Sequence, residues 1–239
     1  LNKKQNICLK ACFLNEYVSR KDLIQIFSEK LINRAVQSNI IQEERNKIKF
    51  NLSFVPYGEH IFLRDVYENY KKFGFDKKTM KNTVWMGADS VIFAKLVKNY
   101  LKNKKFKNAI EIGSGTGIII ILASEFVDTC KAVDFNERAV KYTKLNIAIN
   151  GIKNVDTIYS DLFQKVNGKY DLILVNPWFI DITKGGLEEA PFIIENLNEY
   201  LTENGSCLML LNSYVKNGKD TVYEYLKDFS KNSKYDFSL

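Results

Sequence analysis

Residues 108–117 read NAIEIGSGTG, and residues 118–123 continue as the apolar run IIIILA. The pattern is a short apolar strand that runs into three glycines spaced Gly-x-Gly-x-Gly, followed by a buried helix. Glycines at such a turn let the backbone approach a ligand closely, and the helix N-terminus beyond them supplies unpaired N–H groups. The stretch therefore predicts a strand–turn–helix unit of an α/β domain, with a ligand site at the turn.

The same alternation of apolar strands and amphipathic helices continues to the end of the chain. Further strands are predicted at residues 131–134, 156–160, 170–175 and 206–211, and helices at 91–101, 136–150, 191–201 and 219–229. That order predicts a Rossmann-like, mostly parallel α/β sheet with flanking helices. Residues 235–239 are expected to begin a sixth strand, so we expect the chain to be incomplete at its C-terminus.

Residues 1–80 have a different pattern of apolar and polar residues from the rest of the chain. Three short helical patterns come first, with Ser19 and Ser28 as candidate N-caps of the second and third. Residues 47–55 then alternate apolar and polar, a Pro-Tyr-Gly turn follows, and residues 60–66 form a return strand. Three helices followed by a β-hairpin resemble a winged helix. We therefore predict a small winged-helix-like α+β domain over residues 1–80 and an α/β domain over residues 81–239.

Composition places the chain among ordinary globular proteins. Of its 239 residues, 46% are hydrophobic and 26% charged, which excludes a disordered or collagen-like chain. No apolar run approaches the roughly 18 residues of a membrane-spanning helix, and the N-terminus lacks a signal peptide's apolar core. The four cysteines form no CxxC pair and the chain has one histidine, so we predict no metal site, reduced thiols and a cytoplasmic location.

The net charge of +7 is unevenly distributed. Residues 1–80 hold 15 Lys and Arg against 9 Asp and Glu, whereas residues 81–239 hold 20 against 19. The basic N-terminal part is then either a nucleic-acid or partner-docking module or a lid packed over the larger domain. The candidate recognition helix, residues 29–40, carries only Lys30 and Arg34, which favours the lid.

Distinctive polar residues follow four of the predicted strands: Glu111, Asp134, Asp161 and Asn176. In a doubly wound sheet, ligands bind beyond the carboxyl ends of the strands, so we expect these residues to meet at one rim. Asp134 suits a carboxylate that accepts hydrogen bonds from both hydroxyls of a ribose. The glycine spacing is neither the G-x-G-x-x-G of dinucleotide-binding proteins nor a phosphate-binding P-loop. Together these features predict a cofactor that carries a nucleoside.

Over roughly residues 84–239 the chain resembles the class I S-adenosylmethionine-dependent methyltransferases. The matching segments are Glu111-Ile-Gly-Ser-Gly-Thr-Gly117, Val133-Asp134, Ser160-Asp161 and Asn176-Pro177-Trp178-Phe179. The resemblance implies S-adenosylmethionine as cofactor, with the glycine loop along its methionine moiety, Asp134 on the ribose and Asp161 by the adenine amino group. Ala88-Asp89-Ser90 resembles the segment that lines the methionine end in amide and amine methyltransferases. The implied cofactor-binding set is Glu111, Gly113, Ser114, Gly115, Gly117, Asp134, Phe135, Asp161, Leu162, Asn176, Asp89 and Ser90.

The segment Asn176-Pro177-Trp178-Phe179 resembles the Asn-Pro-Pro-Tyr/Phe loop of methyltransferases that act on planar nitrogen. An amide or aniline-like nitrogen is a poor nucleophile because its lone pair is delocalised. Carbonyl oxygens of Asn176 and Pro177 can accept its two N–H groups and turn the lone pair toward the methyl group. Phe179 can stack on the planar group. The resemblance implies that these four residues form the catalytic loop, although Trp178 departs from a pattern that has proline there.

The sequence thus predicts a methyltransferase that uses S-adenosylmethionine to methylate a planar nitrogen, either a protein glutamine amide or the exocyclic amine of an RNA or DNA base. A macromolecular acceptor and no membrane partner are expected. Two alternatives stay open. One is a small-molecule O- or N-methyltransferase with the N-terminal domain as a lid, and the other is a non-catalytic nucleic-acid-binding ligand sensor.

Overall fold

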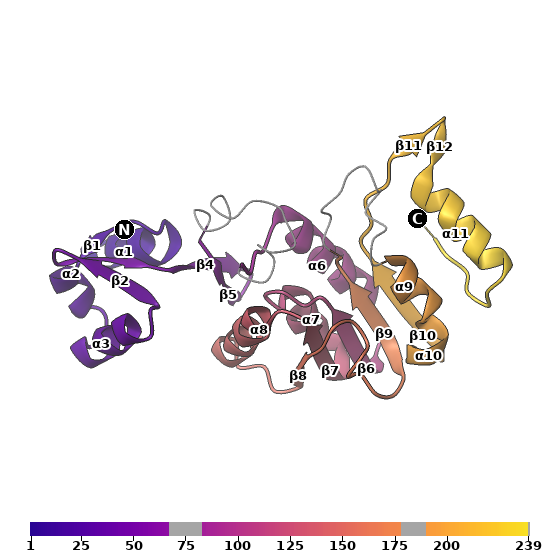
Figure 1. Ribbon diagram of the computed structural model, residues 1–239. Coiled ribbons are helices and arrows are strands. Elements are labelled where there is room, and N and C mark those ends of the chain that lie inside the picture. The colour runs from indigo at the N-terminus through magenta and orange to yellow at the C-terminus, as the bar shows by residue number, and fades with distance from the viewer. Residues whose placement is uncertain (67–82, 178–189, 239) are drawn as a thin grey trace.

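The computed structural model describes residues 1–66, 83–177 and 190–238. At its centre is a five-stranded parallel sheet with the order β10-β9-β6-β7-β8 (Figure 1). The strands are β6 (Phe106–Ile112), β7 (Val127–Asp134), β8 (Val155–Tyr159), β9 (Tyr170–Val175) and β10 (Leu201–Met209). The strand order reverses between β6 and β9, and a ligand site is expected at such a reversal. The Rossmann-like fold predicted from the sequence is confirmed.

Helices cover the two faces of this sheet, because alternate residues of each strand point to opposite sides. Leu172 and Leu174 of β9 pack in one apolar cluster with α6 and α7, whereas Ile173 and Val175 pack in another with α9 and α10. Every residue of α7 is buried, which explains why this helix is apolar all round. The helices are α6 (Ala88–Leu101), α7 (Ile118–Ala123), η2 (Ser124–Phe126), α8 (Glu137–Ile149), α9 (Ala190–Glu195) and α10 (Leu197–Tyr200).

The N-terminal part is a small α+β unit with a three-stranded antiparallel sheet, order β1-β3-β2, as predicted (Figure 1). Ser19 and Ser28 cap α2 and α3 with their side chains, as the sequence predicts. The predicted domain boundary at residue 80 lies outside the described residues and stays a prediction. The elements are α1 (Lys3–Cys8), η1 (Leu9–Phe13), β1 (Val18–Ser19), α2 (Arg20–Ile24), α3 (Glu29–Gln37), β2 (Ile41–Glu44) and β3 (Lys47–Phe50).

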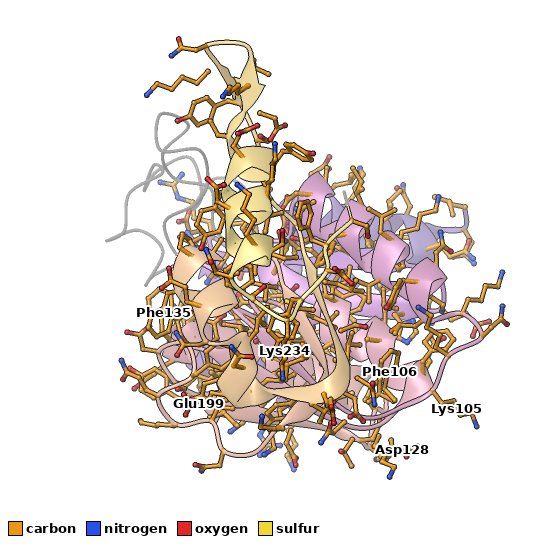
Figure 2. The ribbon with its side chains drawn as sticks, turned by 90° about the vertical axis from the view of Figure 1, so that its right-hand side faces the viewer. Lys105, Phe106, Asp128, Phe135, Glu199 and Lys234 are labelled. Atoms are coloured by element: carbon orange, nitrogen blue, oxygen red, sulfur yellow. The ribbon has the colours of Figure 1, made fainter. Side chains whose placement is uncertain are left out.

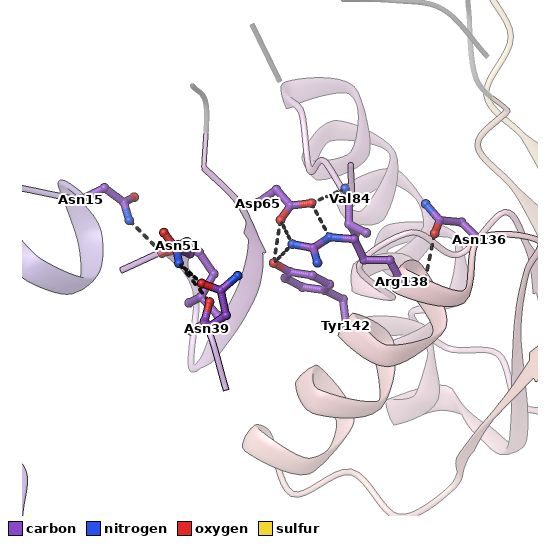
Figure 3. Close-up of polar contacts among 9 residues, drawn as sticks. Asn15, Asn39, Asn51, Asp65, Val84, Asn136, Arg138 and Tyr142 are labelled. Carbon is purple, nitrogen blue, oxygen red and sulfur yellow. Dashed lines mark hydrogen bonds and ion pairs between the residues drawn. The ribbon is translucent and has the colours of Figure 1, made fainter. Parts of the chain in front are cut away.

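The single strand predicted over residues 47–55 is wrong, because the chain divides it between two sheets. β3 ends at Phe50, and β4 (Leu52–Tyr57) pairs instead with β5 (His60–Asp65) in a separate hairpin. The hairpin of the winged-helix-like unit is therefore β2–β3. Asn15 Nδ2 donates to the carbonyls on both sides of the break, at 3.3 Å to Phe50 and 2.8 Å to Leu52. Asn51 at the break donates to Asn39 (Figure 3). Apolar alternation continues through a change of partner, so the periodicity alone did not reveal it.

Helix α8 supplies the hydrogen bonds for the outer edge of β5. The Asn146 side chain accepts from Leu63 N–H at 2.7 Å and donates to Leu63 C=O at 3.1 Å. Asn150 pairs with Ile61 in the same way, with both distances 2.9 Å. The match is geometric: four residues of helix rise about 6 Å, close to the roughly 6.6 Å spanned by two residues of strand. Side-chain amides thus protect a strand edge that would otherwise expose unpaired groups.

The next position along the same edge of β5 is Asp65, which is buried and holds the following segment. Its backbone N–H donates to Val84 C=O at 2.9 Å, and its carboxylate accepts Val84 N–H at 2.6 Å. The same carboxylate forms an ion pair with Arg138 and accepts the Tyr142 hydroxyl at 2.8 Å (Figure 3). The β4–β5 hairpin, residues 83–87 and α8 are therefore bonded to one another.

The C-terminal residues form the short hairpin β11 (Val215–Lys216) and β12 (Lys219–Asp220), then α11 (Thr221–Lys231). These elements lie at the opposite end of the molecule from α2 and α3 (Figure 1). The sixth strand predicted at residues 235–239 is wrong for residues 235–238, which form no strand. Tyr235, like Cys207 and Met209, packs instead against an apolar cluster that contains Ile193 and Leu197. Within the described ranges no helix combines the length and apolarity that a membrane crossing needs.

Candidate functional site

A cavity of about 260 Å³ opens where β6, β7, β8 and β9 end and α6 begins. In Figure 2, Phe135, which follows β7, lies away from Phe106 and Asp128 at the amino ends of β6 and β7. Trp178 and Phe179 of the predicted catalytic loop lie outside the described residues. The predicted site residues that line the cavity are Asp89, Ser90, Glu111, Gly113, Ser114, Gly115, Asp134, Phe135, Asp161, Leu162, Asn176 and Pro177. Gly117 is not among the lining residues.

The glycine loop leaves β6 in a conformation that favours glycine. Gly113 and Gly115 have φ of +75° and +55°, and a Cβ at Gly113 would meet nothing within 4 Å. The absence of a side chain keeps the backbone open to the cavity. Gly117, at φ +77°, packs on α8 instead, because a Cβ there would lie 2.7 Å from Thr143. Its glycine is explained by helix packing, and the cofactor contact predicted for it stays a prediction.

Two buried carboxylates flank the loop. Glu111 is fully buried; one oxygen accepts Ile120 N–H at 3.0 Å, and the other, Oε1, has no partner within the described part of the chain. Burial and the nearby charge of Asp134 raise the pKa of Glu111 well above its ordinary value, although the bond from Ile120 lowers it. Asp134 accepts Gly115 N–H and Asn136 N–H, each at 2.8 Å. With the backbone of Phe135 as a third donor, one of the roughly four acceptor sites of the carboxylate stays open to a ligand hydroxyl.

The pKa of Asp134 is also raised, and burial is the largest cause. Hydrogen bonds from the backbone of Asn136, Gly115 and Phe135 act in the opposite direction. Both acids are thus held in surroundings that penalise their negative charge. A ligand that brings hydroxyl donors or positive charge to them relieves that penalty.

The third strand end contributes Ser160, Asp161 and Leu162. Ser160 is buried and its hydroxyl accepts Lys165 N–H at 2.9 Å, which fixes the turn. Leu162 has φ of +44°, a region that leucine rarely adopts. Backbone strain of this kind is typical of binding sites, and here it lies at an apolar side chain that lines the cavity.

At the fourth strand end, Asn176 faces the first turn of α6. Its Nδ2 donates to Asp89 Oδ2 and to Ser90 Oγ, both at 3.2 Å. Its Oδ1 is buried and has no hydrogen-bond partner among the residues that the structure describes. A buried carbonyl oxygen without a donor is uncommon and costs free energy, so it is expected to receive a donor from a bound molecule.

Charge further restricts what the cavity holds. Its lining includes Asp89, Glu111, Asp134 and Asp161, and among the described lining residues there is no Lys, Arg or His. Such a site disfavours phosphate groups. S-adenosylmethionine fits it, because this cofactor has a ribose diol, a positive sulfonium and ammonium, and no phosphate. Asp134 and Glu111 would hold it at the glycine loop, and Asp161 with Leu162 at the adenine end.

Several cavity residues were not singled out as site residues from the sequence. Thr83 lines the cavity with a buried hydroxyl that has no partner among the described residues, and nothing in the local pattern marks this position. Trp85, an aromatic residue that the sequence leaves open between a substrate mouth and core packing, lines the cavity beside Gly87. Thr143 and Asn146 bond to the carbonyls of the glycine loop from α8, at 3.0 Å to Gly115 and 2.8 Å to Thr116. α8 is an amphipathic helix that also carries Glu137, Lys141 and Lys144, so nothing in the local pattern marks Thr143 or Asn146 as buried.

Proteins with similar sequences are methyltransferases, which is consistent with this site. The family model described as Methyltransferase small domain matches residues 88–236. A putative protein N5-glutamine methyltransferase of Methanocaldococcus jannaschii is 34% identical over 151 residues, which cover 56% of this chain and 74% of that protein. A release factor glutamine methyltransferase of Fusobacterium nucleatum is 27% identical over 222 residues, 89% of this chain and 59% of that protein. The chain therefore spans less than two thirds of the second relative's length.

The fold comparison agrees. A ribosomal protein L11 methylase from Lactobacillus delbrueckii superposes with a TM-score of 0.50 at 22% identity, over 62% of this chain and 70% of that one. At this identity the likeness concerns the fold. The family model, by contrast, covers more than half of the chain. The chain therefore belongs to the Methyltransferase small domain family and is an S-adenosylmethionine-dependent methyltransferase.

Proposed function

We propose that the chain methylates a planar nitrogen of a macromolecule, with a glutamine side-chain amide of a protein as the preferred acceptor. The observation that carries the proposal is Oδ1 of Asn176 at the rim of the cavity, which is buried and receives no hydrogen bond from residues 1–66, 83–177 or 190–238. An oxygen in that state is satisfied by an N–H donor, and an amide or exocyclic amine brings two of them. Two relatives named as glutamine methyltransferases also support the amide.

The chain's own residues provide binding and orientation in this reaction. When bound, S-adenosylmethionine supplies a methyl group made electrophilic by its sulfonium. Asn176 Oδ1 accepts one N–H of the acceptor and thereby turns the nitrogen lone pair away from the acceptor plane, toward the methyl group. As the new C–N bond forms and the bond between the methyl carbon and the sulfonium sulfur breaks, the nitrogen becomes positive and its N–H becomes a stronger donor, so this hydrogen bond strengthens in the transition state. The methylated nitrogen then loses one proton to water and returns to neutrality. We propose that the Pro177 carbonyl accepts the second N–H of the acceptor. We also propose that Trp178 and Phe179 form the walls of the acceptor pocket.

We also propose a cytoplasmic location. All four cysteines are free thiols, which is usual for proteins of a reducing compartment. The acceptor decides between the two roles left open for the basic N-terminal unit. With a macromolecular acceptor the unit is a docking module, and with a small-molecule acceptor it is a lid.

The test is to incubate the purified protein with methyl-labelled S-adenosylmethionine and fractionated cell extract. We expect label in protein, recovered as N5-methylglutamine after digestion and mass spectrometry. Asn176→Ala should lower kcat by about 100-fold, as removal of an oxyanion-type hydrogen bond does, while cofactor affinity is retained. Asn198→Ala, an exposed position on α10, is the matched control and should leave kcat unchanged.

Asp134→Ala should have the converse effect. It removes the carboxylate at the predicted ribose position and should weaken cofactor binding by about 1.5–3 kcal/mol in calorimetry. Label on an oxygen or carbon atom, or in small molecules alone, would contradict the proposal of a macromolecular nitrogen acceptor.

A further inference from the structure

The side-chain amide of Asn176 has two ends in different surroundings. The Nδ2 end lies 3.2 Å from Asp89 Oδ2 and 3.2 Å from Ser90 Oγ. The Ser90 hydroxyl donates its own hydrogen to Asp89 Oδ2 at 3.3 Å, so its lone pairs are the part that faces Asn176. Both groups beside Nδ2 are therefore acceptors. The Oδ1 end is buried, and no described residue donates a hydrogen bond to it.

An asparagine amide can rotate by half a turn, which exchanges its oxygen and its NH2 group with little change in shape. A carboxylate only accepts hydrogen bonds. In the reversed orientation, Asn176 Oδ1 would face the Asp89 carboxylate and the two oxygens would repel. The charge and hydrogen bonding of Asp89 therefore select one of the two orientations.

Orientation decides whether Asn176 helps or hinders the acceptor. With Oδ1 toward the cavity, the side chain accepts an N–H and leaves the nitrogen lone pair free. With Nδ2 toward the cavity, it would donate to that lone pair and occupy the electrons that must form the new bond. The reversed orientation would also repel an acceptor N–H group.

We infer that Asp89 is a positioning residue that holds Asn176 Oδ1 toward the cavity, with Ser90 as its auxiliary acceptor. This assignment rests on the proposed nitrogen acceptor for its consequence in catalysis. It differs from the methionine-end contact that the sequence resemblance implies for Asp89. It also makes the site selective, because an acceptor without an N–H has nothing to offer Oδ1.

Gly87 indicates that the Asp89 carboxylate has a defined place. A Cβ at Gly87 would lie 2.2 Å from Asp89 Oδ1, so the carboxylate folds back over the residue before α6. The backbone of Gly87 is extended, at φ −89°, and any residue could adopt it. The glycine is therefore explained by the space that the carboxylate needs. Gly87→Ala should displace the end of the Asp89 side chain and keep its charge. The added Cβ would also lie 3.3 Å from Trp85 Nε1, which has to give by only a few tenths of an ångström.

The first experiment uses the ligand-free protein with 15N-labelled asparagine. The Asn176 side-chain NH2 signals are assigned by their loss in Asn176→Ala. In Asp89→Asn the acceptor-only partner becomes an amide of the same shape, and we expect these signals to shift. Gly87→Ala should shift them as well. Asp128→Asn makes the same chemical change at an exposed position at the start of β7 and should leave them in place (Figure 2).

The second experiment measures kinetics and cofactor binding on the same variants. Asp89→Asn and Gly87→Ala should each lower kcat about threefold to tenfold, the range for a partly exposed hydrogen bond to a charged group. The affinities for S-adenosylmethionine and for S-adenosylhomocysteine should change by the same factor. A role in binding the sulfonium would instead weaken S-adenosylmethionine selectively, and would be kept in Gly87→Ala because the charge remains.

The outcomes separate the two proposals. Unmoved Asn176 signals in Asp89→Asn, or a selective loss of S-adenosylmethionine affinity, would overturn the positioning role even if a nitrogen acceptor is found. Shifted signals together with methylation of oxygen alone would leave the positioning of Asn176 supported and the proposed function refuted.

Discussion

Replacement of Asn146 by alanine should destabilise the protein far more than the same replacement at Asn150. Both side chains lie on α8, and each pairs with both backbone groups of one residue of β5. They differ in burial. Asn146 is fully buried and its partner Leu63 is 5% exposed, whereas Ile61, the partner of Asn150, is 38% exposed.

The magnitude follows from the groups left without partners. Asn146→Ala leaves three buried backbone groups unpaired: the N–H and C=O of Leu63 and the C=O of Thr116, which is 2% exposed. Each costs about 1–3 kcal/mol, and water that enters the vacated space recovers part of it, so we expect a loss of about 3 kcal/mol. Asn150→Ala should cost about 1 kcal/mol or less, because water can reach the groups of Ile61.

Urea unfolding followed by far-UV circular dichroism measures both losses, with the slope m compared to confirm that the unfolded states match. Calorimetry supplies a second readout. Asn146→Ala should also weaken S-adenosylmethionine binding, because Asn146 holds the Thr116 carbonyl of the glycine loop, whereas Asn150→Ala should not. Equal losses of stability for the two variants would refute the reasoning, since the two differ in burial and in the bond to the glycine loop.

Three further predictions follow from buried groups. Asp65→Asn removes the charge from a buried carboxylate whose ion-pair partner, Arg138, is 44% exposed, and should cost about 1.5–3 kcal/mol in urea unfolding, the range for hydrogen bonds to a charged group, whereas Asp228→Asn, in an exposed pair, should produce no measurable change. Burial raises the pKa of Glu111, so the folded protein holds this proton more tightly than the unfolded chain, whose value is about 4.3. Stability contributed by Glu111 is therefore lost as pH rises, and Glu111→Gln should raise the melting temperature more at pH 8 than at pH 5; equal shifts would contradict this. Gly117→Ala should destabilise more than Gly151→Ala in thermal melts. Both have positive φ, but a Cβ at Gly117 would lie 2.7 Å from a side chain of α8 and one at Gly151 would meet nothing within 4 Å.

Much of the site was predictable because its residues sit at strand ends. Glu111 and Asp134 lie at the carboxyl ends of their strands and Asp161 and Asn176 come just after theirs. Parallel strands bring their carboxyl ends to one rim whatever their order. The described structure places all four around one cavity. The pairing of the N-terminal strands was harder to predict from the sequence. Residues 47–55 keep one alternating pattern, although the chain changes from one sheet to another at Asn51.

Other parts of the site depend on contacts between distant segments. Thr83 and Trp85 reach the cavity because Asp65 binds the backbone of Val84, and no spacing in the sequence announces that pairing. Asn146 of α8 reads as one more polar residue on an amphipathic helix. Its partner Leu63 lies 83 residues away, so nothing local shows that it is buried.

The sequence by itself determined the Rossmann-like fold, the glycine loop and the acids that follow its strands, because local periodicity and strand direction are properties of neighbouring residues. Only the tertiary structure decided how the site is held. It joins the β4–β5 hairpin to α8 by hydrogen bonds and leaves one oxygen of Glu111 without a partner among the described residues. It also orients the Asn176 amide so that Nδ2 faces Asp89. These outcomes depend on which polar groups meet when distant segments pack. A buried donor or acceptor pairs with the group that packing places beside it. The residues between the two partners in the sequence do not indicate which groups will pair.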